Sequence, residues 1–393
     1  MESTKLSVFL FSAWYPTEFT PLLGNFVQNH AKAISKLAQV VVIHQYEDIL
    51  GTQKQKFTIE KKQIENLTEI RVKYRKISTF AGITAKLVRF FRVRKAYQKG
   101  IEFAVQNYGK PDISHVNVLT RTSFPALRLK RKHKIPFIIT EHWSRYLPAD
   151  NTFKGFFRKK ITKYAVKQAA AVTTVSAPLR QAMQSHGLYN ADYQIVPNVV
   201  DTDLFQPFVV EKKEKKSILH VSGLDNREKN FAGILHVMNK LAQKRNDFVL
   251  NVIHDHDNSA YMPFIAENNL QDFVVFHGQK FGQELVRYFN EADFFVLFSN
   301  FENLPCVLIE SFACGKPVVA ANVGGIPDIV NQTNGILVSP QNEDELLDAI
   351  LYLLDHHQNY DSATIRNYAV EHFSENRVGG MFLKIYGKIN KNK

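Results

Sequence analysis

The chain has 393 residues, 45% of them hydrophobic and 22% charged, which fits two or three folded domains and excludes a disordered chain. No apolar run approaches the roughly 20 residues that cross a bilayer, so no membrane-spanning helix is expected in these residues. The net charge of +13 is uneven: residues 1–200 hold 32 Lys and Arg against 12 Asp and Glu, and residues 201–393 hold 18 against 25. The basic half is therefore expected to meet an extended anionic partner.

Apolar strands alternate with amphipathic helices through the first half of the chain. This alternation is typical of a parallel α/β sheet. The strands are predicted at residues 7–12, 40–44, 113–116, 137–140, 171–175 and 194–196, and the helices at 26–37, 85–108 and 159–170. An α/β domain over residues 1–206 is the expectation.

Basic and aromatic residues are interleaved at 71–76, 86–95 and 153–160. Cations beside exposed aromatic rings suit an anionic membrane surface, so we expect an interfacial surface here. The same composition suits RNA, although no nucleic-acid-binding module accompanies it. Solvated helix faces that cover a buried aromatic stripe are the structural alternative.

A charged stretch at 207–217 contains no core residues and is predicted to be a linker. A second α/β series follows and predicts another domain over 218–372. Its strands are expected at residues 217–221, 248–254, 273–277, 293–298, 316–320 and 335–338, and its helices at 231–243, 282–290, 305–314 and 343–355. A further helix is expected within 373–393.

Two carboxylates, Glu302 and Glu310, stand eight residues apart around a helix that Pro305 should open and Gly315 should end. The start of such a helix directs unpaired N–H groups and partial positive charge at an anion such as phosphate. Glu310 would lie about 7.5 Å further along the axis, within reach of a ribose. The spacing predicts a nucleoside diphosphate sugar held end to end, with Glu302 beyond the phosphates. After a short strand, the Gly324-Gly325 turn is expected to lead into another helix at residue 327.

The segment 299–330 resembles the Glu-x7-Glu donor block of the family 4 retaining glycosyltransferases (glycosyltransferase group 1). The resemblance extends to Val196-Pro197-Asn198-Val199-Val200 with the five residues that follow, and to the segments 111–115 and 138–142. It implies the GT-B architecture, in which two Rossmann-like domains face each other across a cleft and the last helix crosses back to the N-terminal domain.

The resemblance also implies roles for residues of the second domain. Glu310 would bind the ribose and Glu302 would bind the sugar hydroxyls. The diphosphate would be bound by Lys229 and by the segment that consists of Asn303, Leu304 and Pro305. Ser299 and Arg227 are further donor-site candidates. Where the family has an arginine, six residues before Lys229, this chain has Gly223.

Two candidates lie in the first domain. Gly24 falls in the loop after the first strand, where the family uses a glycine-containing loop to approach the donor phosphate and the acceptor. His142 ends a strand, on the side where open α/β sheets bind ligands, and the family places a histidine there beside the transferred sugar. A turn glycine and a structurally packed histidine are the alternatives.

No metal and no cofactor are expected. Asp201-Thr202-Asp203 and Asp255-His256-Asp257 match the DxD spelling of metal-dependent glycosyltransferases. We interpret both as chance matches, because enzymes of this type generally use a lysine and a helix dipole instead of the cation.

The resemblance predicts a retaining glycosyltransferase with a UDP- or GDP-linked sugar donor and a glycan or lipid-linked acceptor. Surface polysaccharide, lipopolysaccharide or glycolipid synthesis is the expected setting, with no nucleic acid as partner. We expect a cytoplasmic location at the inner face of a membrane; the two cysteines, too far apart to bridge on one helix, fit a reducing compartment. A nucleotide-sugar epimerase or hydrolase on the same scaffold, and a non-enzymatic membrane or nucleic-acid adaptor, are the alternatives.

Overall fold

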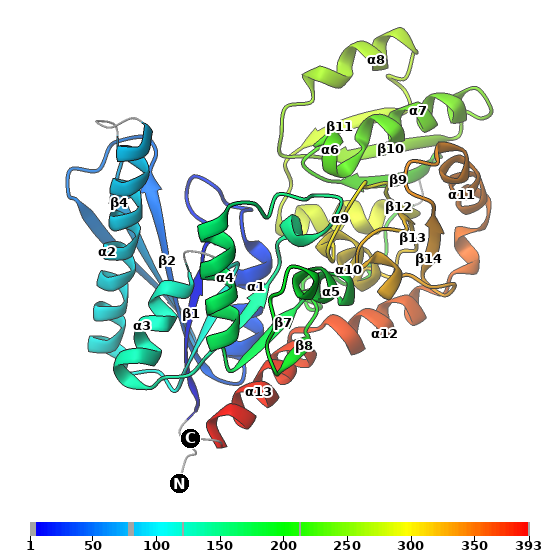
Figure 1. Cartoon of the computed structure of the whole chain (residues 1–393). Helices are drawn as coiled ribbons and strands as arrows, with labels where there is room; N and C mark the ends of the chain where they lie inside the picture. The colour runs from blue at the N-terminus through cyan, green and yellow to red at the C-terminus, as the bar shows by residue number, and fades with distance from the viewer. Residues whose placement is uncertain (1–4, 78–81, 120–121, 212–213, 392–393) are drawn as a thin grey trace.

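The computed structural model describes residues 5–77, 82–119, 122–211 and 214–391, which form two α/β lobes (Figure 1). Each lobe is built on one sheet, with eight strands in the first and six in the second. The two-domain α/β fold that the strand–helix alternation predicts is therefore confirmed.

The first sheet has the order β3-β4-β2-β1-β5-β6-β7-β8, and every neighbouring pair except β3–β4 is parallel. The order reverses between β1 and β5, where α/β sheets open a crevice at the strand carboxyl ends. The strands are β1 (Ser7–Ser12), β2 (Gln39–Asp48), β3 (Phe57–Ile64), β4 (Leu67–Arg75), β5 (Ile113–Asn117), β6 (Phe137–Glu141), β7 (Ala171–Thr174) and β8 (Tyr193–Ile195). The helices are α1 (Asn25–Ser35), α2 (Gly82–Tyr108), α3 (Ser123–His133), α4 (Phe156–Gln168) and α5 (Ala177–Ser185).

Helices cover both faces of this sheet, as the alternation of side chains along β1 shows. Phe9 and Phe11 pack in one core cluster with Tyr97 of α2, whereas Val8 and Leu10 pack in another with α1 and the C-terminal helix. Because successive strand residues point to opposite faces, α2 and α3 lie on one side of the sheet and α1 on the other.

The second sheet has the order β11-β10-β9-β12-β13-β14, and all its pairs are parallel. Its order reverses between β9 and β12, which creates a second crevice at the carboxyl ends of these strands. The strands are β9 (Lys216–Val221), β10 (Phe248–Ile253), β11 (Val274–Gly278), β12 (Phe294–Leu297), β13 (Val318–Ala321) and β14 (Gly335–Val338). The helices are α6 (Asn226–Lys229), α7 (Phe231–Ala242), α8 (Met262–Glu267), α9 (Gly282–Glu291), α10 (Cys306–Ala313), α11 (Glu343–His356), α12 (Ser362–Phe373) and α13 (Glu375–Lys391).

The chain returns to the first lobe at its C-terminal end. Helix α12 packs on α10 of the second lobe, and α13 packs on α1 of the first (Figure 1). A side chain at Gly379 of α13 would lie 2.3 Å from the carbonyl oxygen of Ala33, so the missing Cβ permits the close helix contact. The predicted crossing helix is present.

Several elements differ from the sequence-based expectation. Residues 71–76 belong largely to β4, where Val72 and Tyr74 are buried, so this part of the predicted interfacial surface is wrong. The hairpin β3–β4 and helices α3, α5 and α12 were not predicted. The expected helix at Pro327 is only a 3-10 turn over Ile326–Asp328. Strand β9 begins at Lys216, inside the predicted linker.

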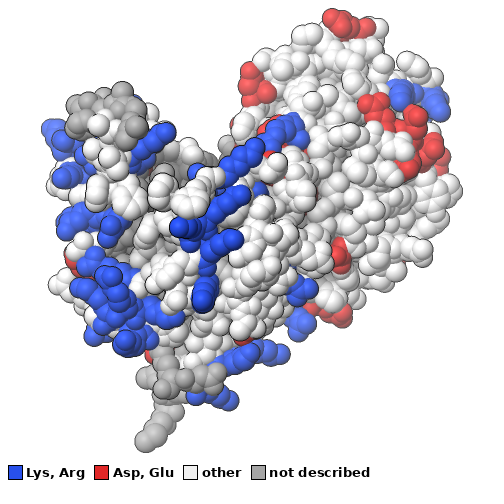
Figure 2. Space-filling model, in the orientation of Figure 1, with Lys and Arg blue, Asp and Glu red and all other residues white. Residues whose placement is uncertain are grey.

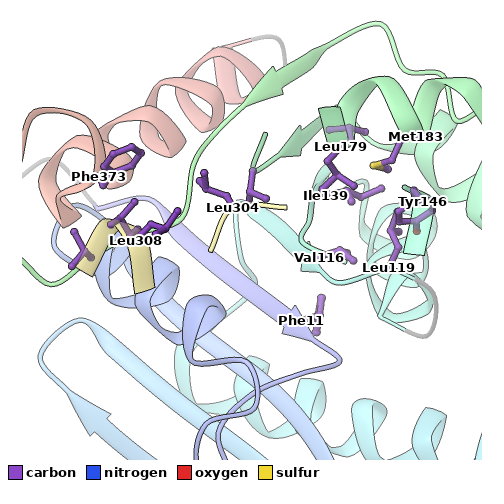
Figure 3. Close-up of a cluster of buried hydrophobic side chains, with 14 of the residues drawn as sticks. Phe11, Val116, Leu119, Ile139, Tyr146, Leu179, Met183, Leu304, Leu308 and Phe373 are labelled. Carbon is purple, nitrogen blue, oxygen red and sulfur yellow. The ribbon is translucent and has the colours of Figure 1, made fainter. Parts of the chain in front are cut away.

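One hydrophobic core is continuous between the lobes. Figure 3 shows Leu304 of the second lobe between Leu308 and Phe373 on one side and Leu179 and Ile139 of the first lobe on the other. The lobes are therefore joined by packed side chains beside the predicted donor block. None of the described helices is both long and apolar enough to span a bilayer.

Candidate functional site

Two loops meet at the carboxyl edge of the second sheet. One follows β9 and carries α6, and the other follows β12 and leads into α10. The backbone N–H of Asn300 donates to the carbonyl of Glu228 at 2.7 Å, which fixes one loop against the other. The contact brings Lys229 and Glu302, 73 positions apart in sequence, to one place.

Lys229 and Glu302 form a short ion pair. The Lys229 Nζ lies 2.6 Å from Glu302 Oε1 and 2.7 Å from Glu228 Oε1. Ser299 Oγ donates to the same Glu302 oxygen at 2.9 Å. Burial works to lower the pKa of Lys229, but the carboxylates of Glu302 and Glu228 raise it above its usual range, so the amine stays cationic. Burial raises the pKa of Glu302, and the ion pair opposes that shift.

The Gly324-Gly325 turn packs directly against the backbone of the loop that carries Glu302. Gly324 has φ +56°, and a Cβ there would lie 1.7 Å from the carbonyl oxygen of Glu302. The N–H of Gly325 donates to the carbonyl of Asn303 at 2.7 Å. Because only glycine permits this approach, the turn sets the position of the buried carboxylate.

The start of α10 has free hydrogen-bonding capacity. Pro305, expected at the first helical position, is instead the N-cap, and no side chain caps the helix there. The first N–H groups of a helix lack intrahelical partners and carry partial positive charge. The helix α10 ends where the sequence predicts: Gly315 follows its last turn and has a φ angle of +70°.

Glu310 lies on the same helix, α10. The first residue of that helix, Cys306, is influenced by both Glu302 and Glu310. Both carboxylates add to the effect of burial in raising the pKa of the Cys306 thiol, so both lie near it. Among the described residues, we find no hydrogen bond or ion pair to the Glu310 carboxylate. Burial raises its pKa to about 7. Glu310 is thus an acid without a partner among the described residues, just over one turn beyond the start of α10.

Replacing Glu310 by glutamine should stabilise the ligand-free protein at alkaline pH. A carboxyl with a raised folded-state pKa favours the folded protein while protonated, and this stabilisation is lost as pH rises through about 7. Glu310→Gln should therefore gain about 1–3 kcal/mol at pH 8 and almost nothing near pH 4.5. Thermal unfolding at both pH values measures the difference, with the exposed Glu371→Gln as control. An equal gain in stability at both pH values would contradict the raised pKa of Glu310.

His142 lies at the carboxyl end of β6, on the opposite lobe. Its ring packs at a tilt against the rings of Phe26 and His30, with centroid distances of 4.7 and 5.2 Å, and its Nε2 lies 3.1 Å from Asn117 Oδ1. The buried Nδ1 makes no hydrogen bond of standard geometry among the described residues. Burial lowers the pKa of His142 far below its usual range, with the neighbouring histidines adding to the effect, so the ring is neutral. The side chain of Asn198 interacts with the ring and works to raise the pKa of His142.

Two asparagines join the lobes at the start of α10. Asn303 Nδ2 donates to the carbonyl of His142 at 2.5 Å, and Asn198 Nδ2 donates to the carbonyl of Leu304 at 2.7 Å. The side chain of Leu304 is buried in the shared core. The side chains of Asn303 and Leu304 therefore face the other lobe, and only the backbone of this segment is left for a diphosphate. We call these two hydrogen bonds the asparagine joint.

The remaining predicted residues take other positions. Arg227 is exposed and reaches the other lobe, where its Nη2 lies 3.2 Å from Asp150 Oδ1, with its guanidinium 5.4 Å from the Phe301 ring centroid. Gly24 precedes α1 with φ +78°, and a Cβ there would lie 2.3 Å from the backbone of Trp14. Gly24 is thus required for a close backbone approach in its own lobe.

The two DxD matches belong to local turns. Asp201 Oδ1 accepts from the backbone N–H groups of Asp203 and Leu204, and Asp257 accepts from Ser259. In the other match, Asp255 binds His256 Nδ1 at 2.6 Å. These bonds give Asp201, Asp255 and Asp257 structural roles.

Sequence reasoning missed Asn198, Asp150 and Asn117 as members of the site. Asn198 lies inside a segment that carries the family resemblance, so its place in that motif was an available signal. Asp150 follows no motif, and its contact with Arg227 depends on how the lobes meet. Asn117 ends β5 beside β6, so the sheet order alone brings it to His142.

Comparison with known proteins covers most of the chain. The family described as Glycosyltransferase Family 4 matches residues 23–204, and that described as Glycosyl transferases group 1 matches residues 215–356. The putative teichuronic acid biosynthesis glycosyltransferase TuaC of Bacillus subtilis is 26% identical over 246 residues, or 61% of this chain. The match spans 60% of that relative's length.

Solved structures support the fold. Sucrose-phosphate synthase from Thermosynechococcus elongatus superposes with a TM-score of 0.78 at 19% identity, covering 99% of this chain and all of that one. Anabaena HepE, solved in complex with UDP, superposes with a TM-score of 0.70 at 15% identity, covering 98% of this chain and all of that one. Two parallel-sheet domains in this arrangement are the GT-B architecture. With both family matches falling on its two lobes, the chain belongs to the family 4, group 1 glycosyltransferases.

Proposed function

We propose that the protein transfers a sugar from a nucleoside diphosphate sugar to an acceptor hydroxyl with retention of the anomeric configuration. The Lys229–Glu302 pair beside the uncapped start of α10 is the observation that carries this proposal. A fixed cation and helical N–H groups converge where a diphosphate would lie, and the partnerless Glu310 stands where a ribose would follow.

Each residue then has a role that its surroundings support. Lys229 and the start of α10 bind the diphosphate, Glu310 accepts from the ribose hydroxyls, and Glu302 accepts from the sugar hydroxyls. Ser299 positions Glu302 rather than the donor. His142 is neutral and its Nε2–H donates to Asn117 Oδ1, so Nδ1 can accept a hydrogen bond from a sugar hydroxyl but adds no charge.

The proposed reaction is a transfer on one face of the sugar. The bond between the anomeric carbon and the β-phosphate oxygen breaks while the acceptor oxygen bonds to the same face of that carbon. The departing phosphate takes the acceptor proton, so no protein base is required. Negative charge develops on the leaving oxygen, and preorganised donors such as Lys229 and the α10 N–H groups stabilise it without reorganisation.

The donor and the setting rest on similarity. A UDP- or GDP-linked sugar fits the site, and the structural neighbour solved with UDP supports a nucleotide donor. The relative named for teichuronic acid biosynthesis supports a role in surface polysaccharide or glycolipid synthesis, with a glycan or lipid-linked acceptor.

The proposal also includes a location at the cytoplasmic face of an anionic membrane. Figure 2 shows Lys and Arg gathered on the N-terminal lobe, while Asp and Glu lie mainly on the other lobe of this face. Basic surfaces of this kind are attracted to anionic lipids without insertion. The free thiols of Cys306 and Cys314 fit the reducing side of that membrane.

A panel of nucleotide sugars, scored by thermal shift and by nucleotide release, tests the activity. A bound donor should raise the apparent stability, and release should require an acceptor. Transfer should survive excess EDTA, because Lys229 and the start of α10 supply the positive charge. Loss of turnover on chelation, restored by magnesium or manganese, would contradict the metal-free mechanism. Fast release without any acceptor would favour a hydrolase.

A further inference from the structure

A large cavity of the described chain lies away from the site above. It is a groove of about 1260 Å³ between α2, α3 and α4, on the face of the first sheet that α1 does not cover. Its volume exceeds the roughly 300–1,000 Å³ of ordinary ligand pockets. Neither the donor nor the reacting atoms of the proposed transfer use it.

The floor of the groove is apolar. Val93, Tyr97, Ile101 and Val105 follow each other at four-residue spacing on α2 and so form one stripe along that helix. The other two helices complete the floor with Phe124, Pro125, Leu127, Leu129, Ile161 and Tyr164. A long apolar channel of this kind suits a hydrocarbon chain.

The rim of the groove is cationic. Seven Lys and Arg line it against a single acidic residue, Glu102. Lys130 is tied to the carbonyl of Gln168, but the others are exposed: Arg94, Arg128, Arg131, Lys132, Lys134 and Lys160. Figure 2 shows these basic regions around uncharged surface, with a column of Lys and Arg over α4 that leads toward the junction of the lobes.

Exposed apolar side chains lie on two of the helices that line the groove, α2 and α4. Phe91 is 62% exposed, Phe156 65% and Phe157 78%, and Leu87 and Tyr164 are more than half exposed. Lys160 Nζ lies 4.5 Å from the ring centroid of Phe156. Aromatic rings beside long cationic side chains are typical of proteins that lie in a membrane interface.

We propose that this groove binds an anionic membrane lipid, with one hydrocarbon chain on the apolar floor and the phosphate on the cationic rim. Charge complementarity and the exposed aromatic rings support a lipid in a bilayer. A single-stranded nucleic acid would use the cations and rings but not the apolar floor of the groove. The inference rests on the proposed membrane location and adds the site and the mode of binding.

Short-chain phosphatidylglycerol below its micellar concentration is the direct probe, with glycerophosphoglycerol, its head group alone, as comparison. The full-length protein should bind the lipid at least about tenfold more tightly than the head group. Co-sedimentation with vesicles should follow phosphatidylglycerol content in phosphatidylcholine and weaken steeply from 0.1 to 1 M salt, as screening shortens from about 10 Å to 3 Å.

Two kinds of variant separate rim from floor. The rim variant replaces Arg94, Arg128, Arg131 and Lys160 by glutamine, and its matched control replaces the exposed Lys54, Lys62, Lys384 and Lys391. The rim variant should lose about tenfold or more in vesicle binding, and the control far less. Ile161→Trp and Leu127→Trp, which fill the floor at unchanged charge, should weaken binding of the short-chain lipid about tenfold. Arg89 and Arg92 are left in place, because they already bind Glu47 and the carbonyl of Arg75.

Three results would overturn the inference: equal loss in rim variant and control, unchanged lipid binding in both filled variants, or single-stranded RNA displacing the lipid vesicles. Nucleotide thermal shifts on the same proteins separate this inference from the proposed function. Failure of lipid binding with intact nucleotide binding rejects the groove alone. Intact lipid binding without any nucleotide-sugar binding rejects the proposed transfer alone.

Discussion

Replacing Lys229 by alanine should lower kcat by about 10²–10³-fold, the largest loss that we expect from a single change. Its ammonium group lies 2.6 Å from Glu302 and stays charged, so it is a preorganised donor for the leaving diphosphate. Steady-state kinetics with a saturating donor measures the effect. A kcat within about threefold of wild type would contradict the assignment.

The same substitution should also affect folding, and controls must separate the two effects. Lys229→Ala leaves Glu302 as a buried carboxylate without its cation, which costs roughly 3–5 kcal/mol of stability. The double variant Lys229→Ala/Glu302→Gln removes the unpaired charge and should recover stability but not turnover. Glu228→Gln removes the more exposed partner of Lys229 and should change kcat little.

Glu310→Ala should weaken binding of both the free nucleoside diphosphate and the nucleotide sugar by ten- to hundredfold. The loss of charge-assisted hydrogen bonds to the ribose corresponds to roughly 1.5–3 kcal/mol. Isothermal titration calorimetry on the folded variant measures both ligands. Unchanged affinity for the nucleotide would remove Glu310 from the ribose site.

Glu302→Ala is the contrasting variant on the same segment. The free nucleotide should bind almost normally, because Glu302 is proposed to contact the sugar and not the nucleotide, while transfer should fall. A loss of nucleotide affinity as large as that of Glu310→Ala would mean that the two glutamates are assigned to the wrong parts of the donor.

Much of the fold could be predicted because buried parallel strands have a simple signature. Strands such as β1, β6 and β13 are continuous apolar runs, and both helix ends around Glu310 were marked by proline and glycine. The hairpin β3–β4 was harder, because β3 is an exposed edge strand whose charged residues hide the strand pattern. The alternation of Val72 and Tyr74 with charged residues in β4 did carry a signal for a strand.

The candidate site was predictable only as far as it is local in sequence. Glu302, Glu310 and Lys229 could be found from spacing and motif. The hydrogen-bond partners of Asn303 and Arg227 could not be predicted. Both side chains contact residues of the other lobe, which come close only when the two lobes pack together. Side-chain direction at a domain boundary is set by tertiary contacts, which no single segment encodes.

The asparagine joint has a consequence for how such enzymes diverge. Both hydrogen bonds end on main-chain carbonyls, those of residues 142 and 304, so their geometry does not depend on which side chains occupy those positions. The N-terminal lobe can therefore change its binding surface by mutation or by exchange with a related gene while the donor loop keeps its register. In this chain the joint thus separates the position of the donor loop from the side chains that the N-terminal lobe presents at its surface.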